Sequence, residues 1–231
     1  FPEARTLRMD RDTTSKKNSH EQILESFGRG DADILIGTQM IVKGHDFSRV
    51  TLVGVLLADL TLFSGDYRAG ERTFDLLTQA AGRAGRGDVP GKVVIQTYKP
   101  DNYAITAAAS QDYRAFYDIE EAYRSLMRYP PEWNMMVIMG TGMDEEQLAN
   151  IMDRMYSLIR GKYINAGHLS VIGPSEPAIS KIKDVYRRVL YIKHRDYRML
   201  VDVKDYVEEW LKENGENDVS VFFDLNPVNM Y

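Results

Sequence analysis

The stretch Gln79–Arg86 reads QAAGRAGR and ends a helical pattern with two arginines, Arg83 and Arg86, spaced three residues apart. Glycines stand at positions 82 and 85, where the chain must turn after the helix. This spacing suits two guanidinium groups that converge on one phosphate. An arginine delivered in that way stabilises charge on a transferring phosphoryl group and is worth about 10³–10⁵ in rate. The stretch therefore predicts one half of a nucleotide-hydrolysing site.

The other half of such a site is not found in the sequence. A P-loop requires G-x-x-x-x-G-K-[ST], and no stretch fits it. The acidic run Asp144–Gln147 (DEEQ) superficially resembles a box that holds Mg²⁺. It opens a helical pattern, however, where acidic residues complement the helix dipole. Because the chain begins at Phe1 without an initiator Met, we expect it to be the C-terminal fragment of a larger protein.

The composition narrows the class of protein. The 231 residues suffice for one large or two small domains, and 44% hydrophobic content supports sizeable cores. The sequence contains no run of 18 apolar residues, so it predicts no membrane span. The absence of cysteine excludes disulfides and thiolate metal sites in this chain and fits a reducing cytoplasm. The four histidines show no paired spacing, so we expect no metal site here.

The charge is distributed unevenly along the chain. The net charge of −5 argues against a wholly basic nucleic-acid binder. Ile179–Arg198 nevertheless carries seven basic and two acidic side chains, whereas Met199–Tyr231 carries two basic and eight acidic ones. Such asymmetry indicates polyanion binding on one face. The alternative is a solvated strand and loop whose charge is balanced by acids on the following helix.

The first hundred residues alternate short apolar runs with helical patterns, as α/β units do. Continuous apolar runs favour strands that are buried on both faces of a parallel sheet. The predicted strands are Arg5–Met9, Asp33–Gly37, Thr51–Leu57 and Val93–Tyr98. The predicted helices are His20–Phe27, with Ser19 as its N-cap, and Glu71–Ala81.

A single long helix is predicted over Asn102–Arg128, and the double proline after Tyr129 ends it because neither proline continues the hydrogen bonding. The pattern that follows is β-α-β-β-α-β, which is the split βαβ, ferredoxin-like arrangement. Its predicted elements are Met135–Met139, Asp144–Tyr163, Leu169–Ile172, Val185–Lys193, Tyr197–Glu213 and Val219–Leu225. We therefore predict three parts: residues 1–100, a connecting helix in 101–131, and an α+β domain in 132–231. The methionines at 135, 136, 139, 143, 152 and 155 have core spacing.

A second informative stretch, Asp33–Phe47, runs from a buried strand into a loop that presents Thr38, Lys43, Gly44 and Asp46. Ligands of open α/β sheets gather at the carboxyl ends of strands. The Thr38 hydroxyl suits a phosphate, Gly44 permits close backbone approach, and Asp46 can accept from a ribose hydroxyl. Ordinary loop chemistry, with Asp46 as a turn residue, remains the alternative.

The two stretches together resemble a known family. Thr-x₄-Lys-Gly-x-Asp followed by Gln-x-x-Gly-Arg-x-Gly-Arg resembles motifs V and VI of superfamily-2 helicases. The run Ala58–Thr73 (ADLTLFSGDYRAGERT) resembles the segment before motif VI in the PriA family of replication-restart DNA helicases. The double proline and the terminal α/β domain are similar to that family too, whereas Glu132–Asn134 departs from the apolar continuation that we expect there. The resemblance implies a second RecA-like lobe with a parallel sheet.

The resemblance also implies a role for each matching residue. Arg86 would be the arginine finger that reaches the γ-phosphate, Arg83 would sit beside it, and Gln79 would couple the nucleotide to the interface between lobes. Asp46, with Gly44 in the same loop, would lie near the ribose. Thr38 and Lys43 would face the DNA backbone.

For partners, the resemblance implies forked and single-stranded DNA, the single-stranded-DNA-binding protein and other primosome proteins. Translocation would run 3′ to 5′, powered by ATP with Mg²⁺ held by an upstream lobe, and zinc is expected only upstream. We expect no membrane contact and a monomer.

Within the terminal domain the basic stretch is the candidate DNA-binding face. Tyr186, Tyr191 and Tyr197 are interleaved with its basic residues, and aromatic side chains can stack on single-strand bases. The candidate DNA contacts are Lys181, Arg187, Arg188 and Lys193. Two other functions stay open: a RecG-like DNA translocase, and a non-catalytic module that docks DNA and proteins.

Overall fold

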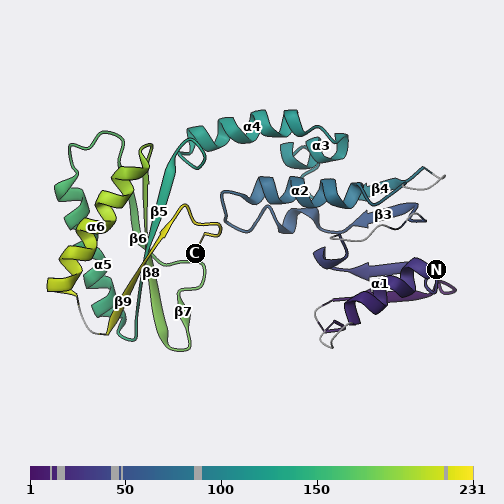
Figure 1. Ribbon diagram of the computed structural model, residues 1–231, viewed down its shortest axis with the longest axis horizontal. Coiled ribbons are helices and arrows are strands. Elements are labelled where there is room, and N and C mark those ends of the chain that lie inside the picture. Colours follow the sequence, from purple (N-terminus) through teal and green to yellow (C-terminus); the bar gives the residue numbers. More distant parts are fainter. Residues whose placement is uncertain are drawn as a thin grey trace. The chain divides into compact units, whose positions relative to one another are not determined.

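The computed structural model describes residues 1–10, 12–14, 19–42, 47, 49–85, 90–215 and 218–230. The chain forms two compact units, Phe1–Ile119 and Glu120–Tyr231. In Figure 1 the first unit runs from purple to teal and the second from teal to yellow.

The first unit is an α/β unit with parallel strands. Strand β1 (Thr6–Met9) pairs with β2 (Ile34–Gly37), and helix α1 (Ser19–Arg29) connects them. Strand β3 (Leu52–Val55) pairs with β4 (Lys92–Ile95), and helix α2 (Ala69–Ala81) lies between them in sequence. Two short 3₁₀ helices, η1 (Gln39–Val42) and η2 (Ala58–Leu60), follow β2 and β3. Helix-connected parallel pairs are the βαβ units expected of a RecA-like lobe.

The strands of this unit are less buried than the sequence predicts. Ile36, Leu52 and Val94 expose 55%, 60% and 47% of their surface. Side chains along β3 and β4 alternate between exposed and half-buried. The expectation of strands buried on both faces is therefore wrong here. Each pair has a helix packed against it, α1 on β1 and α2 on β3, and alternate side chains of a strand point away from that helix.

The single long helix predicted over 102–128 is also wrong, because the structure has two helices there. Helix α3 (Tyr103–Ser110) begins at the N-cap Asn102, whose side chain accepts from the backbone N–H of Ala104. It ends at Gln111, which adopts a left-handed conformation with φ of 56°. Helix α4 (Tyr113–Leu126) then starts afresh. Gln111 carries no sequence signal as clear as a glycine at this position.

The second unit has the predicted split βαβ topology. Its strands are β5 (Asn134–Gly142), β6 (Ser170–Ser175), β8 (Val185–His194) and β9 (Val219–Leu225), joined through helices α5 (Glu145–Lys162) and α6 (Tyr197–Asn214). The spatial order is β6-β8-β5-β9, and all neighbours are antiparallel. A two-residue strand, β7 (Lys181–Ile182), forms a hairpin with β8.

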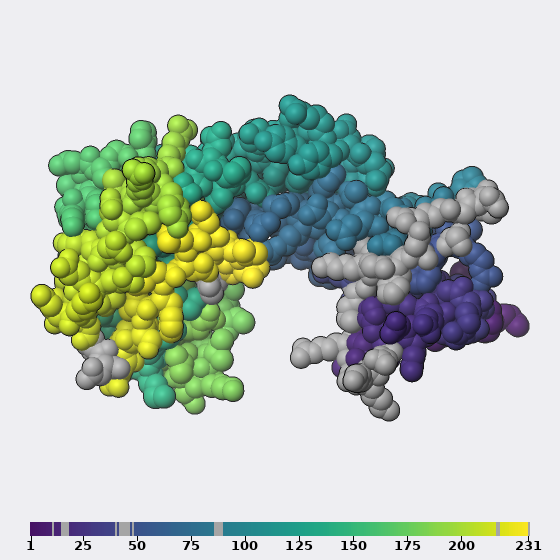
Figure 2. Space-filling view, viewed as in Figure 1, coloured from purple at the N-terminus to yellow at the C-terminus, as the bar shows by residue number. Residues whose placement is uncertain are grey.

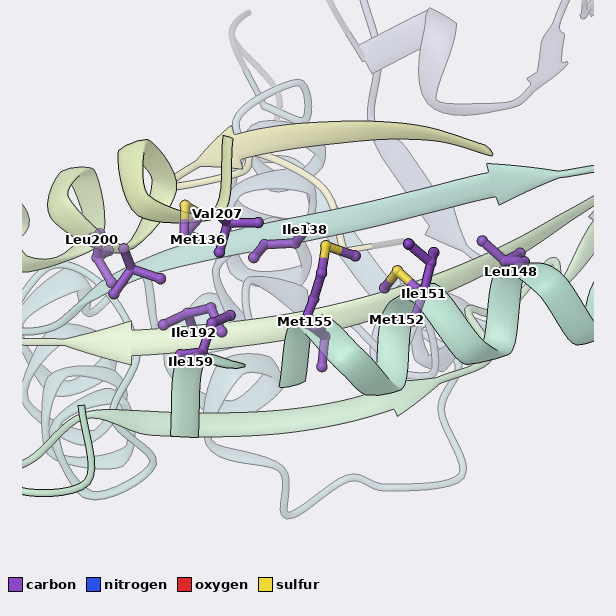
Figure 3. Close-up of a cluster of buried hydrophobic side chains, with 12 residues drawn as sticks. Met136, Ile138, Leu148, Ile151, Met152, Met155, Ile159, Ile192, Leu200 and Val207 are labelled. Atoms are coloured by element: carbon purple, nitrogen blue, oxygen red, sulfur yellow. The ribbon is translucent and has the colours of Figure 1, made fainter. Parts of the chain in front are cut away.

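A continuous core lies between this sheet and its two helices. Twelve fully buried side chains form it, and in Figure 3 Met152 and Met155 point from α5 toward the strand that carries Ile138. The start of α5 is fixed by Asp144, whose carboxylate accepts from the backbone N–H of Gln147 at 2.9 Å. This acidic run is therefore a helix cap, as the sequence indicates. Met143 is the exception among the predicted core methionines, because it lies in the turn before α5 and is 76% exposed.

The space-filling view shows the surface of the second unit, coloured teal to yellow (Figure 2). Among the described residues no helix is long and apolar enough to cross a membrane.

Candidate nucleotide and nucleic-acid sites

Helix α2 carries the first part of the arginine motif. Gln79 lies on its last turn and is exposed, and Arg83 is half-buried just beyond the C-cap Gly82. The backbone N–H of Gly82 donates to the carbonyl of Thr78 at 3.0 Å, and that of Arg83 donates to Ala80 at 3.1 Å. The helix thus ends as predicted, and its end brings Gln79 and Arg83 within one turn of each other. Arg86 lies outside the described residues.

Two glycines close the backbone around this motif. Gly85 has φ of +75°, and a Cβ built on it would lie 2.5 Å from the backbone N of Gly91. A Cβ on Gly91 would in turn lie 2.2 Å from the backbone N of Gly85. Only glycine fits at either position, because no side chain can occupy that space. The N–H of Gly85 also donates to the carbonyl of Val50 at 3.1 Å, which ties the motif to the residue two before β3.

The start of α2 is held by two ion pairs. Arg68 pairs with Glu71 at 3.0 Å, and Arg72 pairs with Asp66 at 2.9 Å. Asp66 is almost fully buried, and it also accepts from the backbone N–H of Arg68. Glu71 and Arg72 thus each form a salt bridge within the first unit, and the helix that carries Gln79 is fixed at its other end.

Asp59 is a buried carboxylate that sequence reasoning did not single out. It is 3% exposed and accepts from the Thr97 hydroxyl at 2.7 Å and from the backbone N–H of Tyr98 at 2.9 Å. The Tyr98 N–H holds the pKa of this carboxyl below its usual value, with help from Thr97. Asp59 therefore ties η2 to the end of β4. Its position directly after an apolar strand is the only feature of the sequence that points to a structural role for Asp59.

Of the second motif, the structure describes the beginning. Thr38 directly follows β2 and is exposed, at the carboxyl end of a parallel strand as predicted. Lys43, Gly44 and Asp46 lie outside the described residues.

The four basic candidates of the second unit do not share one face. Arg188 lies two and four residues before the core residues Leu190 and Ile192 on β8, so it points to the same, helix-covered side, where it approaches Glu145 at 3.9 Å. Arg187 points to the opposite side and donates to the carbonyl of Ile179 at 3.1 Å. The single basic face expected from the sequence is therefore wrong, because the period of two along β8 separates neighbouring residues.

Lys181 and Lys193 differ even more in their surroundings. Lys181 is exposed in the β7–β8 hairpin, where it pairs with Asp184 at 3.2 Å. Lys193 is only 5% exposed, its Nζ donates to the carbonyl of Met127 at 3.2 Å, and it lies 3.5 Å from the centre of the Tyr129 ring. Burial, together with the nearby Arg128, lowers the pKa of Lys193 to about 8.

Comparison with known proteins agrees with this division of the chain. Residues 3–88 match the model of the helicase conserved C-terminal domain, and residues 125–228 match that of the primosomal protein N C-terminal domain.

Relatives match over most or all of the chain. The replication restart protein PriA of Bacillus subtilis (strain 168) is 42% identical over 232 residues, which is 100% of this chain and 28% of that protein. PriA of Synechocystis sp. is 35% identical over 230 residues, again 100% of this chain, and 27% of that protein. PriA of Chlamydia pneumoniae is 42% identical over 193 residues, which is 84% of this chain and 26% of that protein. The chain thus spans less than a third of the length of these relatives.

An α/β unit that matches the helicase conserved C-terminal domain, followed by a split βαβ unit, defines the C-terminal lobe of a helicase joined to a further domain. The chain belongs to the PriA family of replication restart proteins and corresponds to its C-terminal region.

Proposed function

We propose that this chain is the C-terminal part of an ATP-dependent DNA helicase that restarts stalled replication forks and helps to assemble the primosome. The observation that carries the proposal is the placement of Gln79 and Arg83 at the end of α2, in a unit that matches the helicase C-terminal domain. The names and domain composition of its relatives support the replication-restart role.

In this proposal the lobe completes an ATP site from one side. Arg86 is the arginine finger, Arg83 lies beside it, and Gln79 couples the nucleotide to the facing lobe. Asp46, with Gly44 in the same loop, contacts the ribose. The sequence contains no P-loop, so the phosphate cradle and the Mg²⁺ ligands come from another lobe.

The chemistry asked of this chain is electrostatic. We expect this arginine to approach the γ-phosphate only when two lobes close. It then stabilises the charge that develops in the transition state and does not strengthen binding of the ground state. Closure also shifts Thr38 and Lys43, which contact the DNA backbone, relative to the other lobe. Repeated cycles move the protein along one strand, 3′ to 5′.

In the second unit, Lys181 and Arg187 are the better placed of the basic candidates for DNA contact. Arg188 faces the helix layer and Lys193 is buried, so these two are less accessible to DNA. The single-stranded-DNA-binding protein and other primosome proteins are the proposed protein partners, and a monomer is the proposed state in the cytoplasm.

The test is Arg86→Ala in the helicase that contains this chain. We expect DNA-stimulated ATP hydrolysis to fall by about 10³-fold or more, with DNA affinity unchanged within about twofold. Arg114→Ala is the matched control, because Arg114 is an exposed arginine whose only ion pair among the described residues is with Asp118 on the same helix. Near-normal hydrolysis by the Arg86→Ala variant would contradict the role of Arg86 as the arginine finger.

A further inference from the structure

Two exposed arginines flank a buried tryptophan in the second unit. Trp133 is 4% exposed, and the guanidinium carbons of Arg128 and Arg195 lie 5.1 Å and 5.4 Å from the centre of its ring system. Lys193, with its Nζ 3.5 Å from the centre of the Tyr129 ring, lies behind them. We call Arg128, Lys193 and Arg195 the Trp133 cluster.

The backbone around the Trp133 cluster is fixed by hydrogen bonds. The Asn134 side chain donates to the carbonyl of Arg195 at 2.8 Å, which holds Arg195 beside the residue that follows Trp133. Lys193 donates to the carbonyl of Met127, next to Arg128, and Arg128 itself adopts a left-handed conformation with φ of 58°. Two separate segments, 127–134 and 193–195, are thus joined, and each places one arginine beside the Trp133 ring.

Within the part of the chain that the structure describes, no acid is paired with the Trp133 cluster. None of its three cations forms an ion pair with a carboxylate of the described part of the chain. The two acids nearest in sequence have other hydrogen bonds: Asp196 caps α6 by accepting from the N–H of Arg198, and Glu132 accepts from the Ser125 hydroxyl at 3.1 Å.

Like charges held together without a partner cost free energy, and that cost falls when an anion binds. Lys193 reports this cost, because burial and the field of Arg128 lower its pKa. Lys193 is nearly buried and hydrogen-bonded to the carbonyl of Met127, so it is held in one place beside the arginines, unlike a lysine on the open surface.

Phosphate is the anion that this chemistry suits. Guanidinium groups bind phosphate oxygens with two parallel hydrogen bonds, and stacking on an indole ring fixes the plane of each donor fork. Bases cannot stack on Trp133, because the ring is buried beneath the arginines. The site would therefore bind a nucleic-acid backbone without reading its sequence.

The charges of the helix layer favour the same assignment. The outer side of α6 carries Asp202, Asp205 and Glu209, all exposed. Lys193 lies on the other side of the sheet, since it alternates with the core residue Ile192. Helices α5 and α6 together carry eight acidic and six basic side chains, so their side of the sheet offers a polyanion no net positive charge.

We propose that Arg128 and Arg195, backed by Lys193, form a phosphate-binding site for the backbone of single-stranded nucleic acid. The inference deepens the DNA contact proposed above and rests on it, but it assigns that contact to residues outside the predicted set, apart from Lys193.

The test uses the 231-residue chain and a thymidine oligonucleotide as the probe. Trp210→Phe makes Trp133 the only tryptophan, because the sequence contains two. Oligonucleotide binding should then change the emission of Trp133. Arg128→Gln/Arg195→Gln should weaken binding about tenfold and reduce the slope of log K against log salt by about 1.4, since each single-strand phosphate contact contributes about 0.7.

Two matched double variants separate the explanations. Arg160→Gln/Lys212→Gln removes the same charge from exposed positions on α5 and α6 and should leave affinity and slope unchanged. If it weakens binding as much as Arg128→Gln/Arg195→Gln, only net charge matters and the inference is overturned. If Lys181→Gln/Arg187→Gln abolishes binding while Arg128→Gln/Arg195→Gln does not, the DNA contact survives and the Trp133 cluster is excluded.

Two further outcomes would also overturn the assignment. Competition by polyglutamate as strong as that by the oligonucleotide would identify a carboxylate site. If the unmodified chain binds no oligonucleotide at low salt, the DNA contact proposed for this unit fails together with the Trp133 cluster. If the unmodified chain binds but Arg128→Gln/Arg195→Gln binds equally well, only the Trp133 cluster fails.

Discussion

The two units of this chain use their apolar residues differently. In the second unit, long strands and two helices enclose twelve fully buried side chains (Figure 3). In the first unit, the main buried cluster has eight residues, four of them alanines, and it is formed by η2 and helices α2 to α4. Strands of the first unit leave Ile36 and Leu52 more than half exposed. A sheet core holds the second unit together, whereas helix packing holds the first.

The largest expected contrast in stability comes from matched truncations in the two units. Ile138→Ala removes a fully buried side chain from the sheet core and should lower the free energy of unfolding by about 2–5 kcal/mol. Ile36→Ala removes an exposed one and should cost less than about 0.5 kcal/mol. Both tryptophans, Trp133 and Trp210, lie in the second unit, so their fluorescence during urea unfolding reports on Ile138→Ala.

Amide hydrogen exchange in β2 reports on Ile36→Ala. The comparison between the units breaks down if the two truncations have similar costs.

The next effect depends on pH and concerns the buried lysine of the second unit. The pKa of Lys193, about 8, lies below its usual 10.5, so the unfolded chain holds more protons between these values and stability rises with pH there. From pH 7 to pH 10 the unmodified chain should gain about 1–3 kcal/mol relative to Lys193→Met. Urea unfolding at both pH values measures this gain, and Lys212→Met, at an exposed position, is the control. Parallel pH profiles of the unmodified chain and Lys193→Met would show that Lys193 carries no such cost.

The smallest effects come from helix caps, one in each unit. Asp144 caps α5 and Asn102 caps α3, each accepting one backbone N–H. Replacement by alanine should cost about 1 kcal/mol in either unit, because one N–H loses its acceptor. Asp144→Asn should retain most of the stability. If the alanine variant of only one cap loses much more than about 1 kcal/mol of stability, that side chain makes a stabilising contact besides capping.

The sequence predicts the second unit better than the first, for physical reasons. The strand and helix periods of residues 134–225 agree with their tertiary packing, and every predicted element is present. The exposure of Ile36 and Leu52 was missed, because an apolar run shows what a strand can bury but not what covers it. The break at Gln111 was missed because an ordinary residue adopts the left-handed conformation there.

The candidate sites also include some residues whose positions the sequence predicts and others that it does not. Motif spacing placed Thr38 at a strand end and Gln79 and Arg83 at a helix end, and the structure has them there. Their roles, and those of Arg86, Lys43, Gly44 and Asp46, stay predictions. The Trp133 cluster could not be found from spacing, because Arg128 and Arg195 are brought to the Trp133 ring only by the β5–β8 pairing and the turn before β5.

The central claim is that the first unit supplies the arginine needed for nucleotide hydrolysis, whereas Arg128 and Arg195 of the second unit contribute to DNA affinity. The most direct measurement is the DNA-stimulated hydrolysis rate at saturating DNA, together with DNA affinity, for two variants of the helicase that contains this chain. Arg86→Ala should lose hydrolysis and keep affinity, and Arg128→Gln/Arg195→Gln should lose affinity and keep the saturated rate. If both variants lose the same property, the two units do not divide the work in this way.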